Sequence, residues 1–113
     1  MTPPGPDDAA LLRAAAERLE RLAARTTRGD WRTSGLLASR PEVIAHAADG
    51  GTEHVAEARA GTGAWITALS PAVAAPLGAW LREASETAVP PAPAVALARV
   101  LLERLPGAGL SPS

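Results

Sequence analysis

The sequence predicts a small α+β protein with an amphipathic N-terminal helix, a small antiparallel sheet, and two or three C-terminal helices packed on that sheet. Three observations predict this fold class: apolar residues at helical spacing near the start, a glycine-rich turn between short β-prone segments, and later apolar helical segments punctuated by proline. The 113 residues fit one domain, expected at residues 7–105. A Pro/Gly-rich flexible arm is expected at residues 1–6 and a weakly patterned tail at residues 106–113.

The first helix is expected to begin at Asp7, because a carboxylate at the N-cap can accept a bond from an unpaired backbone N–H. Leu12, Leu19 and Leu22 recur at helical spacing and share one face, while Arg and Glu residues occupy the other. Each buried Leu contributes about 2 kcal/mol, so the apolar face decides where the helix docks. Gly29 is the expected stop.

A region of β character follows the first helix, with short strands expected at residues 31–34, 36–37 and 43–47. The clearest turn is Asp49-Gly50-Gly51, since glycine tolerates the positive φ angles of tight hairpins. The sequence therefore predicts an antiparallel hairpin near residues 43–58.

The register of this hairpin stays open, and it decides which chemistry is possible. A two-residue loop places His46 opposite Glu53, whereas a three-residue loop places His46 opposite His54. These two imidazoles could bind a metal or transfer a proton across the hairpin. A catalytic zinc needs three protein ligands, however, so we expect no catalytic residue, no metal and no cofactor.

Two helical segments are predicted within residues 64–81, joined by one stop-and-restart signal. Thr62 is expected to cap the first segment, and Ser70 followed by Pro71 suits the start of the second. Pro76 either kinks the second helix or marks the point where its regular part begins.

Three tryptophans are the only aromatic residues of the chain. Trp65 and Trp80 lie among apolar residues at helical spacing, so we assign them to the core, whereas Trp31 is the candidate interaction residue. Prolines within residues 89–93 separate a last helix with an apolar side along 97–105. That helix is expected to dock on its own domain or on a partner.

Composition excludes several classes of function. The chain has no Cys, which removes disulfides, thiolate nucleophiles and Cys-ligated metals. Its formal net charge is −1, with both signs interspersed, so we expect no nucleic-acid partner. No uninterrupted apolar run approaches about 20 residues, so we expect no membrane partner and a cytoplasmic location.

The order of motifs resembles small Ead-like phage and prophage early-region proteins and related uncharacterised actinobacterial proteins. The resemblance covers residues 9–85 and rests on the Thr27-Arg28-Gly29-Asp30-Trp31 junction, the hairpin, and the Ala64-Trp65-Ile66-Thr67-Ala68-Leu69-Ser70-Pro71 segment. Asp30 replaces a family Pro, and Thr67 interrupts an Ile-Ala step. The resemblance implies a small cytoplasmic accessory protein of mobile-element origin and no established reaction.

The sequence therefore favours a noncatalytic protein-interaction or accessory module that binds another protein or a second copy of itself. One alternative is a small metal-dependent or acid–base enzyme that uses His46 and His54. Another is a regulatory nucleic-acid-binding protein that uses the Arg-bearing first helix.

Overall fold

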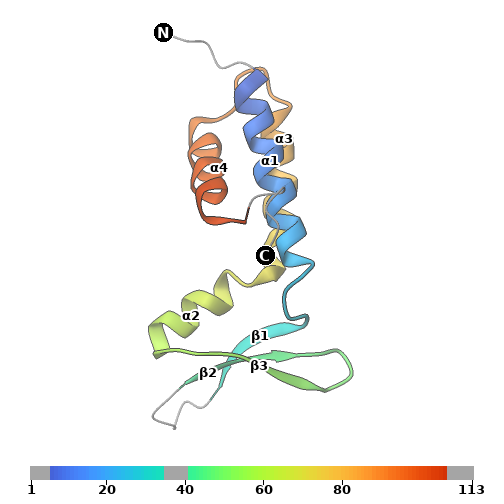
Figure 1. Cartoon of the computed structure of the whole chain (residues 1–113), viewed down its shortest axis with the longest axis vertical. Helices are drawn as coiled ribbons and strands as arrows, with labels where there is room; N and C mark the ends of the chain where they lie inside the picture. The colour runs from blue at the N-terminus through green and yellow to red at the C-terminus, as the bar shows by residue number, and fades with distance from the viewer. Residues whose placement is uncertain (1–5, 35–40, 107–113) are drawn as a thin grey trace. The chain divides into compact units, whose positions relative to one another are not determined.

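The computed structural model describes residues 6–34 and 41–106 and has the expected α+β fold (Figure 1). The elements are α1 (Pro6–Ala23), β1 (Asp30–Ser34), β2 (Glu42–His46), β3 (Thr52–Glu57), α2 (Ala60–Ala68), the 3-10 turn η1 (Pro71–Val73), α3 (Ala74–Ser85) and α4 (Ala92–Arg104). The strand expected at residues 36–37 lies outside the described residues, as does most of the expected arm and tail.

The chain divides into two compact units. The helical unit contains α1, α3 and α4, whereas the sheet unit, Ala24–Val73, contains the three strands, α2 and η1. The sheet unit is therefore inserted in the sequence between α1 and α3.

The helical unit is held together by the packing of α1 against α3 and α4 (Figure 1). Leu12 of α1 and Leu81 of α3 are fully buried. The other buried members of this core are small, namely Ala15, Ala16, Ala84, Ala94 and Ala98. Alanine at these contacts keeps the helices close together, so α1 has a partner helix on two of its sides.

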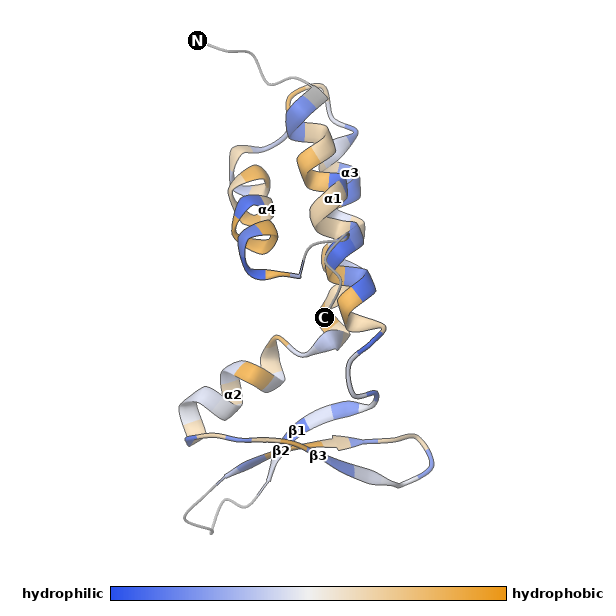
Figure 2. Cartoon of the chain, in the orientation of Figure 1, coloured by the Kyte–Doolittle hydropathy of each residue, from blue (hydrophilic) through white to orange (hydrophobic). Residues whose placement is uncertain are grey.

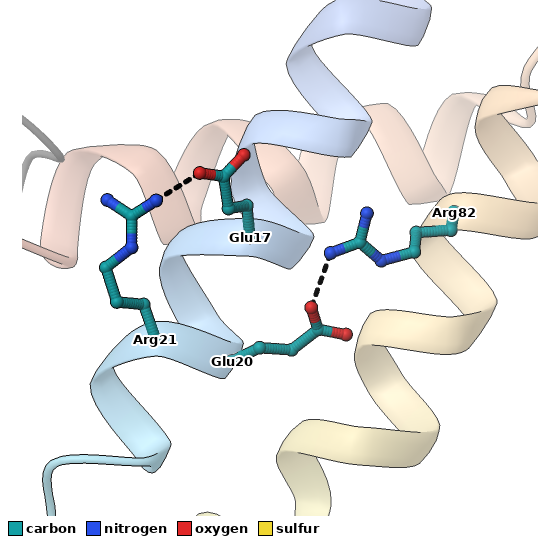
Figure 3. Close-up of polar contacts among 4 residues, drawn as sticks. All are labelled: Glu17, Glu20, Arg21 and Arg82. Carbon is teal, nitrogen blue, oxygen red and sulfur yellow. Dashed lines mark hydrogen bonds and ion pairs between the residues drawn. The ribbon is translucent and has the colours of Figure 1, made fainter.

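An ion pair joins α1 and α3 where a glycine leaves room for it (Figure 3). The Arg82 guanidinium donates to the Glu20 carboxylate, and this bond raises the pKa of Arg82. A Cβ at Gly78 would come 2.9 Å from Cδ of Glu20, so the Glu20 side chain occupies the space that a larger residue would take. A second pair, Glu17 with Arg21, lies along α1 itself.

Both expected ends of the first helix are wrong. The helix begins at Pro6, so Asp7 adds negative charge to the first turn, which the helix dipole favours, and is not the cap. It ends at Ala23, well before Gly29. Gly29 instead has φ 116° next to β1, and a Cβ there would lie 2.8 Å from the carbonyl oxygen of His46. Glycine is thus required by the close approach of the two backbones.

The sheet unit contains a three-stranded antiparallel sheet in the order β1-β2-β3, which confirms the expected hairpin. Val43 and Ala45 of β2 are buried on the face that α2 covers. A Cβ at Gly63 of α2 would lie 3.4 Å from Cγ2 of Thr33, so the helix backbone comes close to the strands. Among the C-terminal helices, α2 packs on the sheet, whereas α3 and α4 pack on α1.

Next to the loop the register differs from both expected registers, since His46 lies opposite Thr52. The pairing then shifts by one residue between Val43 and Ile44, so that Val43 lies opposite Ala56, as the two-residue loop predicts. The Gly50 N–H donates to Ala47 O at 3.0 Å, and the φ of 91° at Gly50 then turns the chain back toward β2. The Ala47 N–H in turn bonds to Gly51 O at 2.8 Å. This arrangement is a type I turn closed by a left-handed glycine, and it moves the loop one residue earlier than expected.

The chain leaves α2 at Ala68 and becomes helical again in η1 and α3. Of the two expected alternatives for Pro76, the structure has the one in which the regular helix begins close to this proline. α2 begins at Ala60, so Thr62 lies inside its first turn and the expected cap is wrong. Ser70 is buried just before η1. α3 begins at Ala74, which places Pro76 in its first turn, where the missing N–H removes no helical hydrogen bond. No kink is therefore required at Pro76.

Replacing Leu12 tests the core of the helical unit. We expect Leu12→Ala to lower the free energy of unfolding by about 2–5 kcal/mol, because it leaves a cavity between helices. Urea denaturation followed by circular dichroism measures the loss. Val100→Ala is the control, since Val100 is 52% exposed and its truncation should cost less than about 1 kcal/mol. Equal losses in the two variants would contradict the assigned core.

Replacing Gly29 tests the backbone approach between the α1–β1 turn and β2. We expect Gly29→Ala to cost about 1–3 kcal/mol of unfolding free energy, because a side chain is strained at this φ and meets the backbone of His46. The control is Gly61→Ala, where the added Cβ meets no atom within 4 Å. That control should leave stability unchanged or slightly raised, since alanine favours a helix.

Candidate functional site

The two histidines lie on the same face of the sheet, the one turned away from Val43 and Ala45. Residues directly opposite in an antiparallel pair share a face, and His54 is paired with Ile44 while His46 is two residues further along β2. The imidazoles are thus diagonal neighbours across the hairpin and do not face each other directly. This geometry corrects both arrangements that the sequence left open.

His54 has a carboxylate partner on this face. Its Nδ1 lies 2.9 Å from Oε2 of Glu42, and both side chains are exposed. An exposed pair of this kind contributes about 0.2–1 kcal/mol at most when the imidazole is charged. Within residues 6–34 and 41–106, no group of three His, Asp or Glu side chains is placed to hold a metal ion. The arrangement is that of a solvated surface pair.

Trp31 lies on the opposite face of the sheet from the histidines. It is paired with Ala45 and is half-buried, and its Nε1 donates to the carbonyl oxygen of Thr27 at 3.0 Å. The Thr27 hydroxyl donates to Oε2 of Glu53 at 3.2 Å. The N–H of the indole is therefore bonded within the sheet unit, while part of the ring stays exposed. The expected interaction role of Trp31 stays a prediction. The structure does not bring Trp31 together with either histidine.

The other two tryptophans, which the sequence assigns to the core, are both exposed. Trp65 is 68% exposed and Trp80 is 42% exposed. α2 contacts the sheet through Gly63, which is buried, and this contact turns Trp65 to the other side of the helix. Leu69, four residues further on, is 54% exposed. We call the exposed apolar surface of this helix the outer face of α2; it consists of Gly61, Ala64, Trp65, Ala68 and Leu69.

The outer face of α2 carries no charge. The sequence has no charged residue between Arg59 and Arg82, and Figure 2 shows no strongly hydrophilic residue along α2. The hydroxyl of Thr62, which is exposed beside this face, is one polar group there, while the half-buried Thr67 hydroxyl donates to the carbonyl oxygen of Ala64 at 3.0 Å. The face thus offers apolar contact area with few polar groups to orient a polar ligand.

The stretch that contains α2 also has the length and composition of a membrane-crossing helix. Residues Ala60–Ser85 are long and apolar enough to cross a membrane, and 22% of the most apolar 18-residue part of this stretch is buried. The stretch is not one continuous helix, since α2 ends at Ala68 and α3 begins at Ala74. Length and composition alone are weak grounds for a membrane span.

Comparison of the chain with family models, with curated proteins and with solved structures gives no match.

Zinc titration tests the solvated state of the histidines. We expect the same weak heats from the wild-type protein and from a His46→Ala, His54→Ala double variant, because the face supplies too few ligands for a closed site. Isothermal titration calorimetry is the measurement. One-to-one zinc binding that disappears in the double variant would show that the two imidazoles form a metal site.

Proposed function

We propose that the protein is a small noncatalytic interaction or accessory module that docks through the outer face of α2 on another protein or on a second copy. The observation that carries the proposal is a tryptophan, Trp65, that is 68% exposed beside an exposed Leu69 on a charge-free helix. Exposed apolar patches of this kind mark interaction sites, and tryptophan is enriched among the residues that dominate binding energy.

The size of the patch indicates the strength of such an interaction. Burying the exposed part of Trp65 removes on the order of 100–170 Å² from water, which is worth about 3 kcal/mol at 25 cal/mol per Å². Association itself costs roughly 4–15 kcal/mol. The tryptophan must therefore act together with Leu69 and the small residues beside it, and the contact is expected to be modest in affinity.

The alternative functions receive less support from the described residues. The enzyme alternative requires His46 and His54 to act with a further reactive group, and the partner found for His54 is the exposed Glu42 carboxylate. The nucleic-acid alternative requires a basic surface on α1, yet that helix carries four carboxylates against three arginines, and Arg21 is paired with Glu17. Docking through the outer face of α2 is favoured by the hydrophobic effect, because binding removes exposed apolar surface from water.

The biological setting is proposed from the resemblance alone. We place the chain among small cytoplasmic accessory proteins of mobile-element origin, as the Ead-like pattern implies. Such a protein acts by contact, which agrees with a function carried by an apolar surface.

Photo-crosslinking tests the docking function. We expect a photoreactive amino acid at position 69 to form covalent adducts with protein in the cells that make the chain, because that position lies on the docking face. Position 89 is the matched control, since Val89 is 67% exposed but lies between α3 and α4. Denaturing electrophoresis and mass spectrometry detect adducts heavier than 11.5 kDa. Equal yields at both positions, or no adduct, would contradict the proposal.

A further inference from the structure

A charge-free stretch of the chain has the length of a membrane-crossing helix. Residues 60–81 contain no charged side chain, and they lie between Arg59 and Arg82. As one continuous helix at 1.5 Å per residue, this stretch would be about 33 Å long, which matches a hydrocarbon core about 30 Å thick. We call residues 60–81 the uncharged segment. It comprises α2, η1 and most of α3.

The fold leaves most of the uncharged segment in water. An apolar stretch of this length in a protein that stays in water is ordinarily a buried core helix or an N-terminal leader. Neither explanation fits, because 22% of its most apolar 18-residue part is buried, and α1 and three strands precede it. Gly63 is the buried residue of α2. A helix that is apolar on all sides, yet not covered by its own fold, is typical of a membrane span.

The ends of the uncharged segment carry the residues that anchor membrane helices. Trp65 lies near one end and Trp80 near the other, and they are 68% and 42% exposed. Tryptophan is enriched at both interfaces of a bilayer, and arginine at the end of a helix extends its charge to the headgroups. Arg59 and Arg82 occupy these outer positions. One placement thus accounts for the two indoles that the core leaves out.

These observations together point to a lipid partner. We infer that the uncharged segment inserts into a bilayer as one helix that joins α2, η1 and α3. This function is separate from docking on a protein, although the outer face of α2 belongs to the same segment. It departs from the sequence-based expectation of no membrane partner, which considered only uninterrupted apolar runs. Pro71 and Pro76 interrupt the hydrogen bonding of such a helix, and proline is more frequent in membrane helices than in soluble ones.

Insertion competes with the core of the helical unit. Leu81 of α3 is fully buried in that core, and Arg82 donates to Glu20 of α1 (Figure 3). α3 must give up these contacts before the segment becomes one helix. The inserted state is therefore rare in water and becomes populated when a membrane is present, because the bilayer binds that state alone.

A depth measurement in phosphatidylcholine vesicles tests insertion. The chain has no Cys, so Ala72→Cys places a single environment-sensitive fluorophore at an exposed position in the middle of the uncharged segment. We expect vesicles to shift its emission to shorter wavelength, with stronger quenching by spin labels deep in the acyl chains than by labels near the headgroups. The control is Ala96→Cys, exposed on α4, whose label should stay in water. A label at position 72 that stays in water, or lies no deeper than the headgroups, overturns the inference.

A charge in the middle of the segment tests insertion without a label. Ala72→Asp should weaken vesicle binding at least about tenfold, because aspartate is strongly disfavoured at the centre of a membrane helix. Ala96→Asp should leave binding unchanged. Circular dichroism in buffer confirms that both variants are folded. Equal binding by Ala72→Asp and the wild type would overturn the inference.

A third pair of variants tests the competition with the core. Glu20→Gln removes the ion pair between α1 and α3, so it should shift binding to lower lipid concentration. Glu17→Gln is the matched control, since it removes an ion pair that lies within α1. Adhesion of the folded surface predicts no shift in either variant, and that result would contradict insertion by release of α3.

The outcomes separate insertion from docking on a protein. Ala72 lies outside the outer face of α2, so Ala72→Asp should keep the protein adducts at position 69 while it loses membrane binding. Protein adducts from a chain that never enters vesicles would leave the docking function standing and reject the bilayer. Self-association of the wild-type chain in sedimentation velocity, without vesicle binding, would likewise reject the bilayer in favour of a second copy.

Discussion

The packing of α1 against the small side chains of α3 and α4 is the constraint on which the helical unit depends. Because alanines fill most of that contact, the space between the helices leaves little room for a large ring. Leu12 and Leu81 supply the largest buried side chains there. The apolar area of Trp80 is accordingly left partly in water, although its helix belongs to the same core.

A comparable constraint acts in the sheet unit, where a glycine sets the orientation of α2. Gly63 brings the helix backbone onto Thr33 and Val43, so the side of α2 without a bulky side chain is the side that meets the strands. The indole of Trp65 then points to solvent. The outer face of α2 is thus a direct result of how closely the helix approaches the sheet.

Local signals in the sequence predicted the element types well, and long-range packing explains what they missed. The Asp49-Gly50-Gly51 turn and the restart at Ser70 depend on backbone preferences of nearby residues, and both were recognised. The exact register depends on which glycine takes the left-handed position, and two were available. The exposure of Trp65 was missed because α2 is apolar on all sides, so its sequence carries no periodicity to tell the covered side from the open one.

The insertion of the sheet unit between α1 and α3 has a consequence for synthesis on the ribosome. α1 emerges early, but its packing partners follow only after the strands and α2 have been made. The strands pair with near neighbours in sequence and need little further chain, so they can form first. The nascent α1 must wait with its leucines exposed, and during that interval it is the segment most open to chaperones.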